Sequence, residues 1–394
     1  MTLEEKDKEY VLQTYARDYT NFVKGSGSTL YDETGRDYID FASGIGVNSI
    51  GHANPTLTDA ICEQANAILH ISNLQIIAPQ AELAEKIVTL SGYDMGVFFA
   101  NSGAEANEGA IKIARKYGET QFETKRYKVI TLEHSFHGRT ITTVKATGQE
   151  SFHTPHFAPY PDGFSYEKSI EAVYDAIDEE TVAVLIELVQ GEGGVEPFDK
   201  EAIQQLARHL KSEGILLIVD EVQTGVYRTG EFLASNLYEI EPDIITLAKG
   251  LGGGVPIGAV MTRHKSILHA GDHGSTFGGN YLSSRAGLAV LEVLQGLYDS
   301  GAVAESHLYF EQKLQAIVAS YPHLFEREVG LGLMRGLRAK SSAIQKATVT
   351  QSMQEGLVVL KAGRNTVRFL PSITISKVEI DEGFMRFEKA IATL

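Results

Sequence analysis

The chain has 394 residues, 43% of them hydrophobic and 22% charged, which is ordinary for a globular protein with a large core. Its formal net charge of −16 argues against nucleic acid and anionic membrane surfaces as main partners, because both require basic patches. The lone Cys62 excludes an internal disulfide, and the polar N-terminus and the absence of a long apolar run favour a cytoplasmic protein without a membrane span.

The first half of the chain begins with a predicted hairpin over residues 29–41, with its turn at Thr34–Gly35. A helix follows over Thr56–His70, opened by Asn54 as N-cap and Pro55 as first helical residue. Continuous apolar runs then alternate with amphipathic stretches, which is typical of strands buried on both faces of a parallel sheet. The predicted strands are Val97–Ala100, Val129–Leu132, Val182–Ile186, Ile215–Val219 and Ile244–Leu247.

Between two of these strands, residues 200–213 carry one apolar stripe, with Asp199 as N-cap and Gly214 as C-cap of the predicted helix. Residues 46–290 therefore indicate an α/β domain with a mostly parallel, doubly wound sheet. Residues 291–394 indicate a smaller α+β domain, with which residues 1–45 are expected to pack. Its predicted elements are a helix over 302–319, a glycine-rich strand Gly330–Leu337, a helix, strands Leu357–Leu360 and Val367–Leu370, and a terminal helix.

Ser102-Gly103-Ala104 follows the first of these strands and opens a helix. Ser102 and Glu105 have the spacing of a capping box, so the segment is either only a well-capped helix or a phosphate cradle. In the second case Gly103 would let an anion approach the backbone amides of the helix N-terminus.

Two further strands also end in chemically useful residues, Asp220 and Lys249. Asp220 is either an N-cap or structural ion-pair partner, or an acid facing the ligand crevice at the carboxyl edge of the sheet. A partly buried Lys249 would have a nucleophilic amine, because burial disfavours its charged form. An anion cradle, an acid and an amine at one sheet edge are the set that pyridoxal phosphate (PLP) requires.

Three motifs give the chain a specific resemblance that covers nearly its whole length: Asn101–Gly109, Ser135–Thr140 and Ala270–Asn280. With them, the sequence resembles the class III aminotransferases of PLP fold type I, and within them most closely the acetylornithine aminotransferases. The resemblance implies a homodimer with shared active sites. It also implies a reaction that moves the ω-amino group of N2-acetylornithine to 2-oxoglutarate, giving glutamate, in arginine biosynthesis.

The resemblance also implies residue roles at the cofactor. Lys249 would hold PLP as a Schiff base and shuttle the proton, Asp220 would bind the ring nitrogen, and Gln223 the ring hydroxyl oxygen. Phe136 would stack on the ring, although without the resemblance it is better explained as a core aromatic. The phosphate would be bound by Ser102, Gly103 and Ala104, joined by Thr276 of the neighbouring subunit.

At the substrate, the resemblance implies that Arg139 binds a carboxylate and that Ser275 contributes to the site. Glu192 would neutralise Arg368 while the amine donor is bound. It would swing away when glutamate or 2-oxoglutarate brings its α-carboxylate to Arg368. Without the resemblance, both residues are better explained as surface or structural charges.

Other functions stay open at this stage. Ornithine, succinylornithine, succinyl-diaminopimelate and 4-aminobutyrate are alternative donors, and a PLP aminomutase or racemase or a non-catalytic binding protein is a more distant alternative. The chain departs from the family pattern at Gln75, Leu188, Tyr281 and Ser372, none of which removes a catalytic group. No metal site is expected, because the histidine pairs spaced by three, 134/137 and 153/156, lack a completing carboxylate or cysteine.

Overall fold

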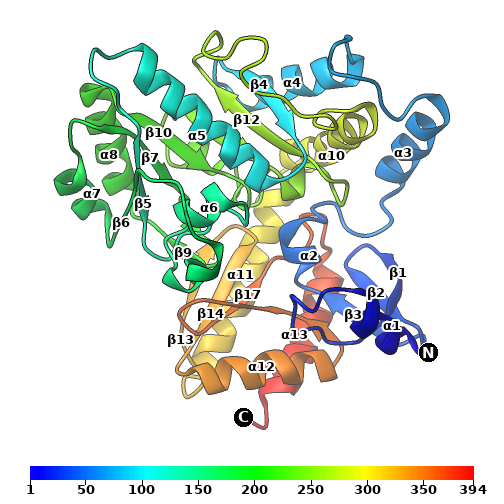
Figure 1. The fold of residues 1–394 in the computed structure, drawn as a ribbon. Helices are drawn as coiled ribbons and strands as arrows, with labels where there is room; N and C mark the ends of the chain where they lie inside the picture. Colours follow the sequence, from blue (N-terminus) through cyan, green and yellow to red (C-terminus); the bar gives the residue numbers. More distant parts are fainter.

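The computed structural model describes all 394 residues and is built around a seven-stranded sheet with the order β4-β12-β11-β10-β7-β5-β6 (Figure 1). Only β12 runs antiparallel to its neighbours, so the predicted mostly parallel sheet is confirmed. All five predicted strands are present, and β6 and β12 are additional. The strands are β4 (Gly96–Ala100), β5 (Lys128–Leu132), β6 (Phe164–Glu167), β7 (Thr181–Ile186), β10 (Leu216–Asp220), β11 (Ile244–Leu247) and β12 (Gly258–Thr262).

Helices cover both faces of this sheet, which explains why its central strands are continuous apolar runs. Every residue of β7, β10 and β11 is buried. The helices of this part are α3 (Pro55–Ala67), α4 (Ala78–Ser91), α5 (Gly103–Thr120), α6 (Ile141–Ala146), α7 (Ile170–Ala176), α8 (Lys200–Glu213), α9 (Ala234–Leu237) and α10 (Tyr281–Asp299). Two-stranded β8 (Val189–Gln190) and β9 (Glu196–Pro197) lie outside the sheet.

The predicted caps of α8 are present, since Asp199 accepts from the Ala202 N–H and Gly214 adopts a left-handed conformation. Asn54 and Pro55 likewise open α3. The prediction that α3 continues to residue 70 is wrong, because the helix ends at Ala67. Ile68 and Leu69 are partly exposed and do not belong to the buried stripe of the helix. A prediction from apolar periodicity alone therefore extended the helix beyond its C-terminal end.

The C-terminal part contains α11 (Ala302–Ser320), α12 (Ser342–Gln354), α13 (Lys377–Ile391) and a second sheet of order β13-β14-β17-β16. The predicted single strand over residues 330–337 is wrong. It is a hairpin of β13 (Phe325–Leu331) and β14 (Met334–Ala339), with Gly332 at a positive φ in the turn. The strand predicted at 357–360 is two short strands in different sheets, β15 (Leu357–Val358) and β16 (Leu360–Ala362), while β17 covers Thr366–Phe369.

The N-terminal residues lie with this C-terminal part, as the blue and red segments at one end of Figure 1 show. After α1 (Leu3–Tyr10), β1 (Phe22–Ser26), β2 (Thr29–Asp32) and β3 (Asp37–Asp40) form a sheet that β15 completes. Phe41 packs its ring on three C-terminal phenylalanines, and α2 (Ser43–Gly46) then leads toward the large sheet. The domain boundaries at 45 and 290 stay predictions. No helix is long and apolar enough to cross a membrane.

Candidate active site

A cleft of about 420 Å³ lies at the carboxyl edge of the large sheet, where β4, β10 and β11 end. Parallel strands present their carboxyl ends at one edge, so residues far apart in the sequence meet there. The cleft is lined by seven of the predicted site residues, Ser102, Gly103, Ala104, Phe136, Arg139, Asp220 and Lys249.

The N-terminus of α5 forms one wall of the cleft. The Ser102 hydroxyl accepts from the Glu105 N–H at 3.2 Å, but the predicted capping box is wrong in its second half. Glu105 reaches past Ser102 and accepts from the Asn101 N–H at 2.6 Å. The amides of Gly103 and Ala104 have no partner within the helix, as expected of its first turn, and can bind an anion.

Gly103 also has a packing role that the sequence did not reveal. A Cβ at this position would lie 2.7 Å from the side chain of Val222, in the loop that follows β10. The glycine therefore lets the N-terminal end of α5 lie directly against the loop that follows Asp220.

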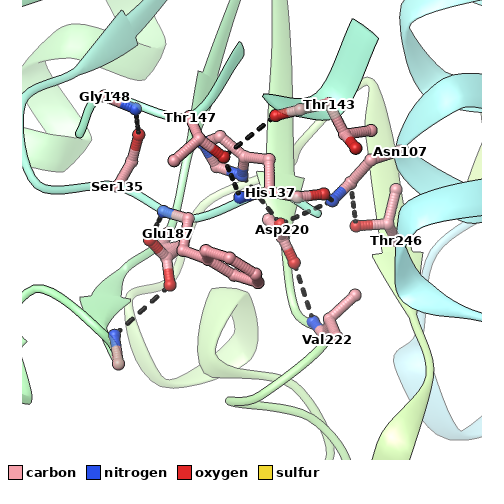
Figure 2. Close-up of polar contacts among 12 residues, drawn as sticks. Asn107, Ser135, His137, Thr143, Thr147, Gly148, Glu187, Asp220, Val222 and Thr246 are labelled. Carbon is pink, nitrogen blue, oxygen red and sulfur yellow. Dashed lines mark hydrogen bonds and ion pairs between the residues drawn. The ribbon is translucent and has the colours of Figure 1, made fainter. Parts of the chain in front are cut away.

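Asp220 is the most enclosed acid of the cleft, only 4% exposed. Its Oδ2 accepts from His137 Nδ1 and Asn107 Nδ2, both at 2.8 Å, and its Oδ1 accepts from the Val222 N–H at 3.0 Å (Figure 2). Burial alone would raise the pKa of Asp220, but the hydrogen bonds and charge of His137, with those from Val222 and Asn107, hold it below the ordinary value. Asp220 is therefore a carboxylate at neutral pH, and His137 carries its proton on Nδ1.

Lys249 lies two residues after the end of β11 and has a positive φ of 42°, which a non-glycine residue rarely adopts. Burial lowers the pKa of its amine, although Glu192, Asp220 and Glu187 act in the opposite direction. A larger share of neutral amine follows, and this is the nucleophilic form that attacks a carbonyl carbon.

Arg368 and Glu192 lie beside the cleft and form an ion pair of 2.5 Å between Nη1 and Oε1. Arg368 comes from β17 of the C-terminal part, and Glu192 from the loop after β8. The same Nη1 donates to Gln223 Oε1 at 3.2 Å, so Gln223 contacts this pair. The buried Nε of Arg368 has no partner in the protein. The guanidinium thus has donor capacity left for a ligand.

Arg139 lies at the cleft mouth with its guanidinium 4.1 Å from the ring centroid of Phe152 and 5.6 Å from that of Phe136. These contacts hold an otherwise exposed cation over two aromatic faces. The backbone N–H of Phe136 donates to Glu187 Oε2 at 3.0 Å, which fixes the segment that carries both Phe136 and Arg139.

Ser275 and Thr276 do not lie in this cleft. They line a separate cavity of about 810 Å³, together with the exposed loop around Asn73 and Leu74. Asn101, which lines the cleft, donates from Nδ2 to Ser275 Oγ at 3.2 Å and so connects the two cavities. Within one chain, Ser275 and Thr276 are therefore separate from the other ten predicted site residues.

Three residues of the site received no role from the sequence. Glu187 is buried, and burial raises its pKa to about 7. It follows the apolar run of β7, the same signal that identified Asp220, so the sequence could have revealed it. Asn107 and His137 lie within the motifs Asn101–Gly109 and Ser135–Thr140, but no local pattern indicates that either side chain contacts Asp220. His137 contacts Asp220, and no cluster of three or more metal-binding side chains occurs in the structure.

Two of the departures from the family pattern have a structural explanation. Leu188 is fully buried in the cluster under α8, where a larger apolar side chain fills space. Ser372 shares a buried hydrogen bond of 2.8 Å with Ser28, which ties the N-terminal sheet to the end of β17. Nothing in the structure explains Gln75 or Tyr281.

The residues of the cleft fit PLP. A helix N-terminus with free amides suits its phosphate, a buried carboxylate suits its protonated ring nitrogen, and an amine of lowered pKa suits its aldehyde. The cleft volume lies in the range of small-molecule sites.

Comparisons with known proteins agree with this fit. The family model described as "Aminotransferase class-III" matches residues 13–391. The chain is 61% identical to the acetylornithine aminotransferase of Wolinella succinogenes, over 98% of both chains.

Among solved structures, the ornithine aminotransferase of Toxoplasma gondii, which contains PLP at partial occupancy in its active site, has a TM-score of 0.93 and 31% identity. That match covers 100% of this chain and 95% of the other. The N-acetylornithine aminotransferase of Stenotrophomonas maltophilia has a TM-score of 0.82 and 32% identity, over 96% of this chain and 97% of the other. The fold is PLP fold type I, and the chain belongs to the class III aminotransferase family.

Proposed function

We propose that the protein transfers the ω-amino group of N2-acetylornithine to 2-oxoglutarate, giving N-acetylglutamate 5-semialdehyde and glutamate in arginine biosynthesis. The observation that carries the proposal is one cleft that joins Lys249, Asp220 and the α5 N-terminus to Arg139, with Arg368 beside it. The donor is proposed from the 61% identity to the acetylornithine aminotransferase of Wolinella succinogenes.

In this function PLP, when bound, supplies an electron sink for the carbon that loses a proton. Lys249 would attach the cofactor and, once released by the substrate amine, carry the proton at its Nζ. Asp220 would keep the proton on the ring nitrogen, Gln223 would bind the ring hydroxyl oxygen, and Phe136 would face the ring. The phosphate would lie on the amides of α5, at Ser102, Gly103 and Ala104.

Two arginines give the substrate its orientation in this proposal. Arg139 would bind one carboxylate at the mouth of the cleft, and Arg368 the α-carboxylate of glutamate or 2-oxoglutarate. Glu192 is positioned to neutralise Arg368 whenever no second carboxylate is present. One active site can then accept a donor and an acceptor that differ in charge.

We further propose a homodimer whose neighbouring subunit supplies Ser275 and Thr276 to each site. The support is that both residues lie outside their own chain's cleft, next to exposed Leu74 and Phe277, which a subunit contact would cover. Mixing an inactive Lys249→Ala chain with an inactive Thr276→Ala chain tests this, because only a mixed dimer regains one complete site. Absence of any recovered activity, together with a monomeric mass in solution, would contradict the proposal. A cytoplasmic location is proposed as well, which the single exposed Cys62 fits.

A donor panel tests the reaction itself. With 2-oxoglutarate as acceptor, kcat/KM should be highest for N2-acetylornithine among the five donors, the others being ornithine, succinylornithine, succinyl-diaminopimelate and 4-aminobutyrate. Negligible turnover of N2-acetylornithine would overturn the donor assignment while leaving the aminotransferase family intact.

A lysine variant tests the chemistry. Lys249→Ala should lower multiple-turnover kcat by roughly a thousand-fold or more, because the proton carrier and the attachment point are lost together. Lys200→Ala is the matched control, since Lys200 forms only a surface ion pair with Glu239. Retained activity in Lys249→Ala would overturn the proposed mechanism.

A further inference from the structure

The buried amide of Asn107 joins three separate elements next to the cleft. Its Nδ2 donates to Asp220 Oδ2 and to the carbonyl oxygen of His137, both at 2.8 Å, and its Oδ1 accepts from the Thr246 hydroxyl at 2.8 Å (Figure 2). Asn107 is 1% exposed and Thr246 is fully buried. Helix α5, strand β10 and strand β11 are therefore connected through one side chain.

The strand register explains why this connection is possible. Asp220 and Thr246 are direct partners on the neighbouring parallel strands β10 and β11, so their side chains leave the sheet on the same face. Asn107 contacts both from the helix above. Its amide has one satisfied orientation, because both neighbours of Nδ2 are acceptors and the neighbour of Oδ1 is a donor.

The hydrogen bonds at Asp220 are unevenly divided between its two oxygens. Oδ2 accepts two, from His137 and Asn107, whereas Oδ1 accepts only the Val222 N–H. A carboxylate oxygen has about two acceptor positions, so Oδ2 is filled and Oδ1 keeps one free. Asn107 also supplies its hydrogen bond without a positive charge, so it stabilises the carboxylate without competing electrostatically with a cationic ligand.

We propose that Asn107, oriented by Thr246, is a positioning residue that fills Oδ2 of Asp220 and so directs Oδ1 to the ring nitrogen of the cofactor. The inference rests on the proposed use of PLP at this site. It assigns to Asn107 and Thr246 a role in the protonation of the ring. Thr246 acts through Asn107, which in turn contacts Asp220.

The readout that follows is spectroscopic. A proton on the ring nitrogen disfavours a second proton on the nitrogen that joins the ring to Lys249. If a substitution weakens the interaction between Asp220 and the ring proton, the pH midpoint at which the visible absorption band of the bound cofactor titrates should therefore rise. A purely structural role for Asn107 would change thermal stability and leave this midpoint where it is.

The experiment compares Asn107→Leu, Thr246→Val and the control Thr348→Val in the PLP-loaded protein. Thr348 is a fully buried threonine of α12, remote from the cleft. In Asn107→Leu the midpoint should rise by about one pH unit and kcat should fall about ten-fold, with KM for both substrates within about two-fold, as expected for loss of one hydrogen bond to a buried charge. Thr246→Val should change both quantities in the same direction by less, and Thr348→Val should change neither.

An unchanged midpoint in Asn107→Leu and Thr246→Val, whatever their thermal stability, would overturn the proposal. If Asn107→Leu does not fold, Thr246→Val decides alone, because it removes a single hydroxyl and no atom that touches Asp220. The outcome is separate from the proposed function. An active Lys249→Ala variant would refute the mechanism, whereas an inactive one with normal Asn107→Leu spectra would refute only the positioning role.

Discussion

The two ends of the active site hold their charges in different ways. At the Asp220 end, a carboxylate that is 4% exposed accepts three hydrogen bonds, and two of the donors, His137 and Asn107, are themselves hydrogen-bonded to buried threonines. At the other end, Arg368 is 2% exposed, but its single carboxylate partner, Glu192, has a side chain that is 32% exposed. One end is closed, and the other is open on one side.

This difference matches what each end would do in the proposed function. A buried hydrogen-bond network is costly to break, since removal of one member leaves others unpaired in a medium of low dielectric constant. In the Arg368–Glu192 pair one partner is partly solvated, so the carboxylate of Glu192 can move into solvent and be exchanged for another carboxylate. The closed end suits a cofactor that stays, and the open end suits substrates that alternate.

The closed end is tested most severely at Asp220. Asp220→Asn removes the charge and places an amide NH2 group either opposite the Val222 N–H or opposite His137 and Asn107. In both orientations buried donors face one another. The lost interactions amount to about 3 kcal/mol or more, and kcat should fall by about a hundred-fold or more. Steady-state kinetics at saturating substrates measure this, and a kcat within ten-fold of the wild type would contradict a closed, charge-dependent network.

The open end should show a large effect on acceptor binding rather than on the chemical step. Arg368→Met removes the guanidinium and leaves Glu192 solvated, so KM for 2-oxoglutarate should rise by roughly 30- to 100-fold, or about 2–3 kcal/mol. Arg327→Met is the matched control, because Arg327 pairs with Glu196 at the surface. An equal rise of KM for donor and acceptor would contradict the assignment of Arg368 to the acceptor.

Glu192→Gln sharpens the comparison, because it weakens the exchangeable pair without touching the closed network. The neutral amide leaves Arg368 charged when the donor is bound, so KM for the donor should rise by about three- to five-fold, while KM for 2-oxoglutarate stays or falls. The ratio of the two KM values measures this. A hundred-fold loss of kcat instead would mean that the pair is as rigidly required as Asp220.

The smallest effect concerns Glu187, which belongs to the closed end. Burial raises the pKa of its carboxyl group to about 7. The folded protein binds this proton more readily than the unfolded chain does. The resulting stability is fully present below the ordinary glutamate pKa and is lost as pH rises through about 7. Between about pH 5 and pH 8, the Tm of cofactor-free Glu187→Gln should therefore fall less than that of the wild type, by roughly 2–5 °C. Glu123→Gln, at an exposed position, is the control, and equal pH slopes for all three proteins would contradict the assignment.

The sequence predicted the large sheet well because its strands are buried on both faces and its helices carry local caps. It failed where the local pattern is ambiguous. The apolar pattern of α3 continues past the end of the helix, and the glycine-rich sequence of the β13–β14 hairpin is also compatible with a single strand. It also could not show that Glu105 accepts from the N–H of Asn101 rather than from that of Ser102. The two amides are four and three residues before Glu105, and its side chain can reach either.

By itself the sequence determined the chemical inventory: an acid and a lysine at the ends of apolar strands, a helix N-terminus, and the motifs of the family. These are local features, and each depends on residues within one segment. Only the tertiary structure decided which groups control them. Asn107 reaches Asp220 across 113 positions, and Arg368 reaches Gln223 across 145. Such contacts depend on strand register and on how the C-terminal part packs, and no local pattern encodes either.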